Sequence, residues 1–222
     1  MGVAYMELND GNKGLFVIQN NSEMNLDRKR AKPKTGHEKF IFNSKELDFS
    51  VMDFWRWSTS DILSNTIRGG LAEFIVATAL NIDLTILRDE WSAYDLKTSE
   101  GIKVEVKCSA YIQSWFQTKL SNISFSTRPA FYWDSDSNKF STIKKRHADV
   151  YVFCLLHHTD KLTIDPLNIN QWEFYVLATQ QLNEYKRSQH SITLKSLRGL
   201  TSTIPYNKLK ETIIDRHKLN KE

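Results

Sequence analysis

Apolar and polar positions along the chain fall into blocks with different periods, and together these blocks predict an α/β domain. Residues 148–156 form a nearly continuous apolar run, which is typical of a strand buried on both faces. Residues 172–177 predict another strand, and helical character follows over residues 179–187. Residues 61–80 predict a helix upstream of a short hairpin. A helix, a hairpin, a buried strand and a further helix describe an α/β core with a mixed sheet.

The hairpin carries the most informative polar residues. Asp95 ends one short apolar run, and Glu105 and Lys107 lie inside the next run, after the turn at residues 98–101. Side chains alternate along a strand, so Glu105 and Lys107 share one face. Two carboxylates and one ammonium would then meet at one spot. Two carboxylates repel unless a cation lies between them, and oxygen-only ligation suits Mg²⁺ better than Zn²⁺.

The spacing of these residues resembles the PD-(D/E)XK nuclease superfamily, which has the restriction-endonuclease-like fold. The matching pattern is Asp95, the spacer 96–104, and then Glu105-Val106-Lys107. Tyr94 stands where the superfamily's name has Pro, at a position that is loose in the superfamily. The resemblance covers about residues 60–180. It implies a restriction-endonuclease-like core, with a central mixed β-sheet flanked by helices, in a protein of bacterial or phage type.

The resemblance also implies a mechanism. Asp95 and Glu105 would hold one Mg²⁺, for which Mn²⁺ can substitute, with the Val106 carbonyl as a further ligand. The metal would polarise a phosphoryl oxygen and activate water. Lys107 would orient that water and steady the growing negative charge. A lysine has an ordinary pKa of about 10.4, so we prefer this charge-stabilising role to that of a general base.

Glu73 is the one acid in the apolar stretch of the predicted helix, which has Ser60 or Asp61 as its expected N-cap. It lies on the small-residue face that we expect to meet the sheet. A buried lone carboxylate needs a metal or a basic partner. In the superfamily, a helix before the Asp strand often carries an additional acid, so Glu73 is a candidate catalytic and metal-binding residue. The alternative is a structural ion pair with Arg68 or another base.

Gln113 follows the Glu-x-Lys strand by a few residues. Several nuclease branches carry a Gln or another polar residue there, which contacts the scissile phosphate or a metal-bound water. The resemblance therefore makes Gln113 a candidate catalytic residue. The alternative is an ordinary polar loop.

Length and composition place the whole chain, residues 1–222, in one nuclease-like domain, because 41% hydrophobic content can build a substantial core. Residues 1–48 would form an N-terminal extension and residues 60–180 the catalytic core. The two cysteines lack zinc-site spacing. The sequence shows no signal-peptide pattern and no apolar run long enough to span a bilayer. We therefore expect a cytoplasmic protein. Towards the chain ends, we expect a short strand at residues 15–18 and an amphipathic helix at residues 206–218.

The net charge of +4 and the pI of about 8.9 mildly favour a polyanionic partner. Basic residues in two polar stretches are candidate DNA contacts, although solvated loops would explain them equally well. These candidates are Arg28, Lys29, Arg30, Lys32, Lys34 and Arg146. Trp55 and Trp57 could stack on bases, but we expect them to pack against the sheet.

The sequence thus predicts a metal-dependent endonuclease that hydrolyses DNA phosphodiester bonds, with DNA as partner, no membrane association and, as in many members of the superfamily, a homodimer. A competing hypothesis is a non-catalytic nucleic-acid-binding or assembly module on the same fold. The presence of both acids and the lysine argues against it. An RNA-directed nuclease and a salt-bridged hairpin on an unrelated α/β protein are two further hypotheses.

Overall fold

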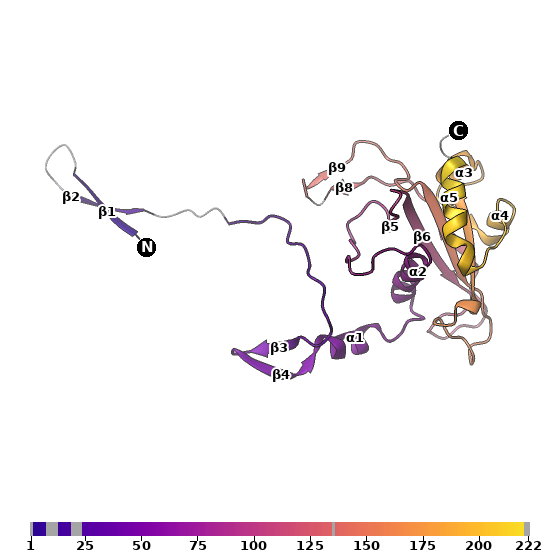
Figure 1. Cartoon of the computed structure of the whole chain (residues 1–222), viewed down its shortest axis with the longest axis horizontal. Coiled ribbons are helices and arrows are strands. Elements are labelled where there is room, and N and C mark those ends of the chain that lie inside the picture. The colour runs from indigo at the N-terminus through magenta and orange to yellow at the C-terminus, as the bar shows by residue number, and fades with distance from the viewer. Residues whose placement is uncertain (1, 8–12, 19–23, 135, 220–222) are drawn as a thin grey trace. The chain divides into compact units, whose positions relative to one another are not determined.

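The chain, seen in a computed structural model, forms two compact units, residues 1–30 and 31–222 (Figure 1). The structure describes residues 2–7, 13–18, 24–134 and 136–219. In the smaller unit, β1 (Gly2–Glu7) and β2 (Lys13–Ile18) pair as antiparallel strands, in agreement with the strand expected at residues 15–18. The sequence predicts a single domain with an extension ending at residue 48, whereas the division falls at residue 30.

A mixed four-stranded sheet forms the centre of the larger unit, in the order β11-β10-β6-β5. The hairpin pairs β5 (Leu96–Lys97) with β6 (Lys103–Ala110) in antiparallel fashion. Strand β6 runs parallel to β10 (Val150–Leu156), and β10 runs antiparallel to β11 (Trp172–Ala178). The mixed α/β class and the strands predicted near residues 148–156 and 172–177 are therefore confirmed.

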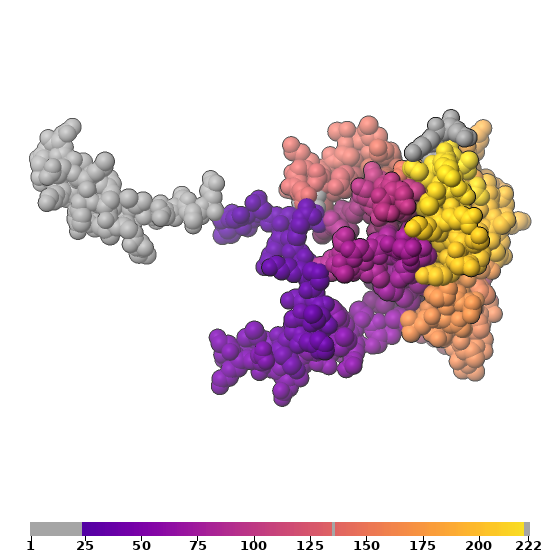
Figure 2. All heavy atoms as spheres, viewed as in Figure 1, coloured from indigo at the N-terminus to yellow at the C-terminus, as the bar shows by residue number. Residues whose placement is uncertain are grey.

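Both faces of this sheet are covered, which explains the continuous apolar run of β10. Helices α2 (Asn65–Ala79) and α5 (Leu209–Leu219) pack on one face, where Val104, Val106 and Val152 lie in the core (Figure 1). Helix α5 lies at the surface and is yellow in Figure 2. The other face packs against β7 (Ser124–Ser126), α3 (Thr179–Glu184), β12 (Ser191–Thr193) and α4 (Leu194–Arg198). Each large apolar side chain buried in these layers contributes roughly 1.5–3 kcal/mol.

The remaining elements are shorter. They are β3 (Lys39–Phe42), β4 (Lys45–Ser50), α1 (Val51–Thr59), β8 (Trp133–Asp134), β9 (Lys139–Phe140) and the 3-10 helices η1 (Ile169–Gln171) and η2 (Tyr206–Lys208). No helix in the described part of the chain has the length and apolar character needed to cross a membrane.

Three helix boundaries differ from the prediction. Helix α2 begins after Ser64, because the Asp61 carboxylate accepts the amides of Leu63 and Ser64 and closes a separate turn first. Helix α3 ends at Glu184, since the backbone turns extended at Tyr185. The C-terminal helix begins at Leu209, after the first residues of the predicted segment form η2.

The expectation that Trp55 and Trp57 pack in the core is wrong. Both lie on α1, which has no buried residue. Trp57 is 85% exposed, and Trp55 is half-buried against Gly36. The apolar residues of this aromatic-rich segment are not in the sheet core.

The turn of the β5–β6 hairpin depends on Gly101, whose φ of +86° lies in the left-handed region. We expect Gly101→Ala to lower the free energy of unfolding by about 1 kcal/mol, because an alanine is strained in this conformation. A Cβ on Gly101 or on Gly70 would meet nothing within 4 Å, so crowding contributes to neither substitution. Gly70→Ala, inside α2, should instead raise the free energy of unfolding by roughly 0.5–1 kcal/mol. Urea unfolding measures the change in both variants. Equal changes in the free energy of unfolding would contradict the role of the left-handed conformation at Gly101.

Candidate active site

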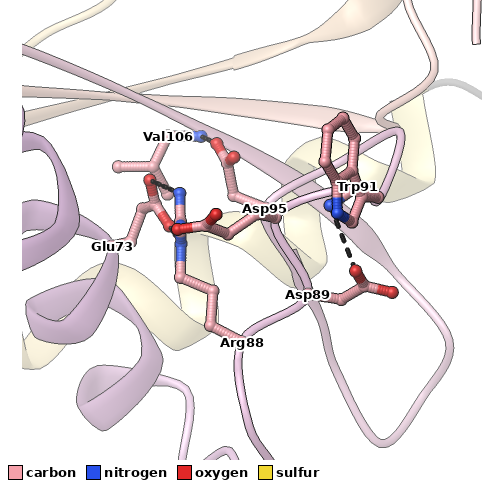
Figure 3. A network of polar contacts seen from close by, with 7 residues as sticks. Glu73, Arg88, Asp89, Trp91, Asp95 and Val106 are labelled. Atoms are coloured by element: carbon pink, nitrogen blue, oxygen red, sulfur yellow. Dashed lines mark hydrogen bonds and ion pairs between the residues drawn. The ribbon is translucent and has the colours of Figure 1, made fainter. Parts of the chain in front are cut away.

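Asp95 is fixed at the open edge of β6, immediately before β5. Its amide donates to the Val104 carbonyl at 3.1 Å. Its carboxylate Oδ2 accepts the Val106 amide at 2.7 Å, beyond the point where β5 pairs with β6 (Figure 3). The side chain thus continues the pairing that the two-residue strand begins. In an extended strand the N–H and C=O of one residue point to the same edge, so the Val106 carbonyl also faces the side of Asp95.

Glu105 and Lys107 lie on one face of β6, as strand alternation predicts. They stand beside Tyr151 and Phe153 of β10, on the face opposite α2. Lys107 Nζ donates to Glu105 Oε1 at 2.5 Å. The Glu105 and Lys107 side chains are 18% and 30% exposed, so the pair is partly shielded from water.

Glu73 reaches the same region from α2, and its partner is Arg88. The guanidinium binds the carboxylate in bidentate fashion, with Nε donating to Oε2 and Nη2 donating to Oε1 at 3.0 Å (Figure 3). Arg68, the base considered from the sequence, instead binds the Leu63 carbonyl, Asn65 and Gln113. The ion pair expected as an alternative for Glu73 is therefore present, with a different base.

The three carboxylates are close enough to affect one another electrically. Burial, followed by the neighbouring charges of Glu105 and Glu73, raises the pKa of Asp95 to about 7, against the Val106 hydrogen bond and Lys107. The hydrogen bond that Arg88 donates to Glu73 raises the pKa of Arg88, and the charges of Glu73, Asp95 and Glu90 add to the effect. Negative charge is thus in excess around Asp95, even with two basic side chains nearby.

The donor set fits a hard divalent cation. The carboxylate oxygens and the Val106 carbonyl are the ligand type that Mg²⁺ prefers. A cation would also relieve the repulsion that raises the pKa of Asp95. Among the described residues, however, no three His, Cys, Asp or Glu side chains are gathered as a ready ligand set. Glu105 is turned to Lys107 and Glu73 to Arg88, so binding requires these pairs to open.

Gln113 lies in a different setting from the one predicted. Its side chain is buried, with Nε2 donating to the Ala110 carbonyl and to Ser121 Oγ, and Oε1 accepting from Arg68 at 3.3 Å. This internal network is at odds with contact to a scissile phosphate. It favours a structural role for Gln113.

Arg146 also differs from the prediction, because it is buried rather than presented to a ligand. Its guanidinium donates to the Thr127 carbonyl, to Asn183 Oδ1, and to both the side chain and the carbonyl of Gln189. The predicted DNA contact is at odds with this geometry. Arg146 instead connects the segment after β7 to α3 and to the loop before β12.

The N-terminal basic run keeps its predicted character. Lys29, Arg30, Lys32 and Lys34 are exposed and Arg28 is partly exposed, in a segment without helix or strand. DNA contact by this run stays a prediction.

Arg88 is the residue that sequence reasoning missed. It is the one basic residue in the segment 81–95, among several acids, and that isolation was the available signal. The same segment carries Trp91, which packs edge-on against Trp133 with the two ring centroids 4.9 Å apart. The Trp91 amide donates to Asp89 Oδ1 at 3.1 Å, which fixes the turn before Asp95 (Figure 3).

A family model described as Bacteriophage T4 endonuclease IV matches residues 16–196 of the chain. The matched range includes Glu73, Arg88, Asp95, Glu105 and Lys107. A comparison with curated proteins found no match.

The raised pKa of Asp95 predicts a pH-dependent stability. In the unfolded chain Asp95 ionises near its ordinary value of 3.8, and in the folded chain near 7, so stability falls as the pH rises between these values. Asp95→Asn, whose amide oxygen can still accept from Val106, should therefore unfold with a free energy about 1–3 kcal/mol higher than wild type at pH 8 in EDTA. The gain should vanish near pH 4, as followed by thermal unfolding.

The control for this experiment is Asp83→Asn. Hydrogen bonds from the Thr85 side chain and backbone lower the pKa of Asp83, so its neutral variant should be less stable than wild type at pH 8. Equal responses of the two variants would contradict the assignment of burial and repulsion to Asp95.

Arg146→Lys should lower the free energy of unfolding by about 2–4 kcal/mol, because a lysine cannot replace the guanidinium bonds and leaves buried acceptors unpaired. Under conditions where the variant is folded, the salt dependence of its DNA affinity should match that of wild type. Lys32→Ala, in the exposed basic run, should leave stability unchanged and reduce the salt slope by about 1. A reduced salt slope for Arg146→Lys would instead support the predicted contact between Arg146 and DNA.

Proposed function

The chain belongs to the bacteriophage T4 endonuclease IV family, and from this membership and the site geometry we propose that it is a divalent-metal-dependent endonuclease that hydrolyses DNA phosphodiester bonds. The observation that supports the chemistry best is the position of Asp95. Its carboxylate is held at the sheet edge between the Glu105–Lys107 and Glu73–Arg88 pairs, with its pKa raised by burial and by both acids.

We further assign the site to the PD-(D/E)XK type. The supporting features are an acid ahead of an antiparallel hairpin, Glu-x-Lys on the adjacent strand, and an additional acid on the preceding helix. The parallel pairing of β6 with β10 supports the same assignment, because it gives the mixed sheet that this type of core requires.

Asp95, Glu105 and the Val106 carbonyl would hold Mg²⁺ or Mn²⁺, with Glu73 completing that site or supporting a second one. The cation supplies charge stabilisation at the phosphate and activation of a water. Lys107 lies within hydrogen-bonding distance of Glu105. When Glu105 turns to the metal, the Lys107 ammonium would be free to stabilise a phosphate oxygen. Water would then attack phosphorus and give up a proton, the phosphorus–oxygen ester bond would break, and the departing oxygen would take up a proton.

The test is cleavage of supercoiled plasmid, linear duplex and single-stranded DNA with Mg²⁺ or Mn²⁺. Lys107→Ala should lower the rate about 10²–10³-fold, because it removes a charge aimed at the developing negative charge. Asp95→Asn should lower it at least as much, since it removes the central ligand. Lys208→Ala removes a lysine of an exposed ion pair with Glu211 and should cut like wild type.

Each failure has a distinct meaning. DNA binding without cutting under any metal would support a non-catalytic module on the same fold. Cutting of RNA but not of DNA would support an RNA-directed nuclease. Cutting that persists in both Lys107→Ala and Asp95→Asn would remove the catalytic role from this hairpin.

A further inference from the structure

We propose that Arg88 is a resident counter-ion that competes with a divalent cation for the carboxylates of Glu73 and Asp95, and thereby sets the metal affinity of the site. This inference rests on the proposed function, which explains why a metal should bind here. It adds a positioning residue that acts through the acids rather than on the substrate.

The first support is the way in which Arg88 holds Glu73. The guanidinium engages both carboxylate oxygens, and the Glu73 side chain is only 12% exposed. Bidentate guanidinium–carboxylate pairs are strong and geometrically specific. A cation that approaches Glu73 therefore meets a positive charge already in place, and repulsion between like charges raises the free energy of binding.

The second support is a second carboxylate partner outside the site. Arg88 Nη1 donates to Glu90 Oε1 at 3.3 Å, and the Glu90 side chain is 78% exposed. Arg88 is itself 48% exposed and lines an open pocket together with Phe74 and Leu87. Its side chain can therefore leave Glu73, turn outward and keep a carboxylate partner.

The third support is charge balance. Glu73, Asp95 and Glu105 bring three negative charges when ionised, against the positive charges of Lys107 and Arg88. A divalent cation and Lys107 together balance the three carboxylates. Arg88 is then surplus at the site, and the outer carboxylate of Glu90 becomes its better partner. With Arg88 in place one negative charge stays in excess, and exchange of Arg88 for the divalent cation removes that excess.

The experiment measures Mn²⁺ binding to the full chain without DNA, by electron paramagnetic resonance of the free ion. Arg88→Gln should bind Mn²⁺ about tenfold more tightly than wild type, because a competing unit charge is removed. Arg88→Lys keeps the charge but loses the bidentate hold and should show a smaller change in the same direction. If Arg88→Gln does not fold, the Mn²⁺ affinity of Arg88→Lys tests the proposal in its place.

Arg198→Gln is the matched control. Arg198 lies on α4, is 50% exposed and pairs with Glu173 at 2.9 Å. This variant therefore also removes one partly exposed arginine from an ion pair, but the ion pair does not include an acid of the proposed metal site. Its Mn²⁺ affinity should equal that of wild type. A gain as large as that of Arg88→Gln would reduce the effect to net charge and overturn the proposal.

The outer partner gives an independent readout. Glu90→Gln should weaken Mn²⁺ binding in wild type, since the outward position of Arg88 loses its carboxylate, and should have a much smaller effect in the Arg88→Gln background. Equal effects in both backgrounds would contradict the exchange. Saturating Mn²⁺ should also raise the melting temperature more in Arg88→Gln than in wild type.

The two proposals fail separately. If wild type cuts DNA with metal and folded Arg88→Gln has unchanged or weaker Mn²⁺ affinity, the counter-ion role is wrong and the proposed function stands. If no variant binds Mn²⁺ and wild type cuts nothing, both proposals are wrong.

Discussion

The hydrogen bond from the Val106 amide to the Asp95 carboxylate is the interaction on which the site depends. Strand β5 pairs with only two residues of β6, so a side chain must satisfy the next backbone donor on that edge. Asp95 does this from a partly buried position and brings a carboxylate between Glu105 and Glu73. Uncompensated charge in such a place is costly, which explains why Lys107 and Arg88 each lie on one of the flanking acids.

This arrangement connects the stability of the hairpin to its proposed chemistry. An acid whose pKa is about 7 is poised between its two protonation states near neutral pH, and a divalent cation would favour the ionised form. Glu73 lies on α2, and Glu105 and Lys107 lie on β6; a helix and a central strand fix their positions better than free loops do. The basic partners hold the acids in place and offset part of the free-energy cost of burying their charges.

The regular elements could be predicted because their signals are local. The apolar run of β10 and the alternation in β6 follow directly from which faces are buried, and the hairpin follows from its turn. The predictions that met contrary geometry concern residues whose environment is set by distant contacts. The sequence presents Arg146 as a surface base, but hydrogen bonds to Thr127, to Asn183 of α3 and to Gln189 enclose it. The role of Arg88 could not be predicted for the same reason, because only the folded chain brings Arg88 to Glu73.

The charges of the site also constrain how a polyanion can approach it. Three acids against two bases would repel a phosphate backbone, so DNA affinity must come from elsewhere. The exposed lysines of the N-terminal basic run are suited to that task, because phosphate contacts supply affinity without sequence information. A cation at Asp95 would then reverse the local sign of charge only where a bond is to be broken. Binding and chemistry would therefore depend on separate groups, with the basic run acting on any phosphate and the carboxylates acting only when a metal is present.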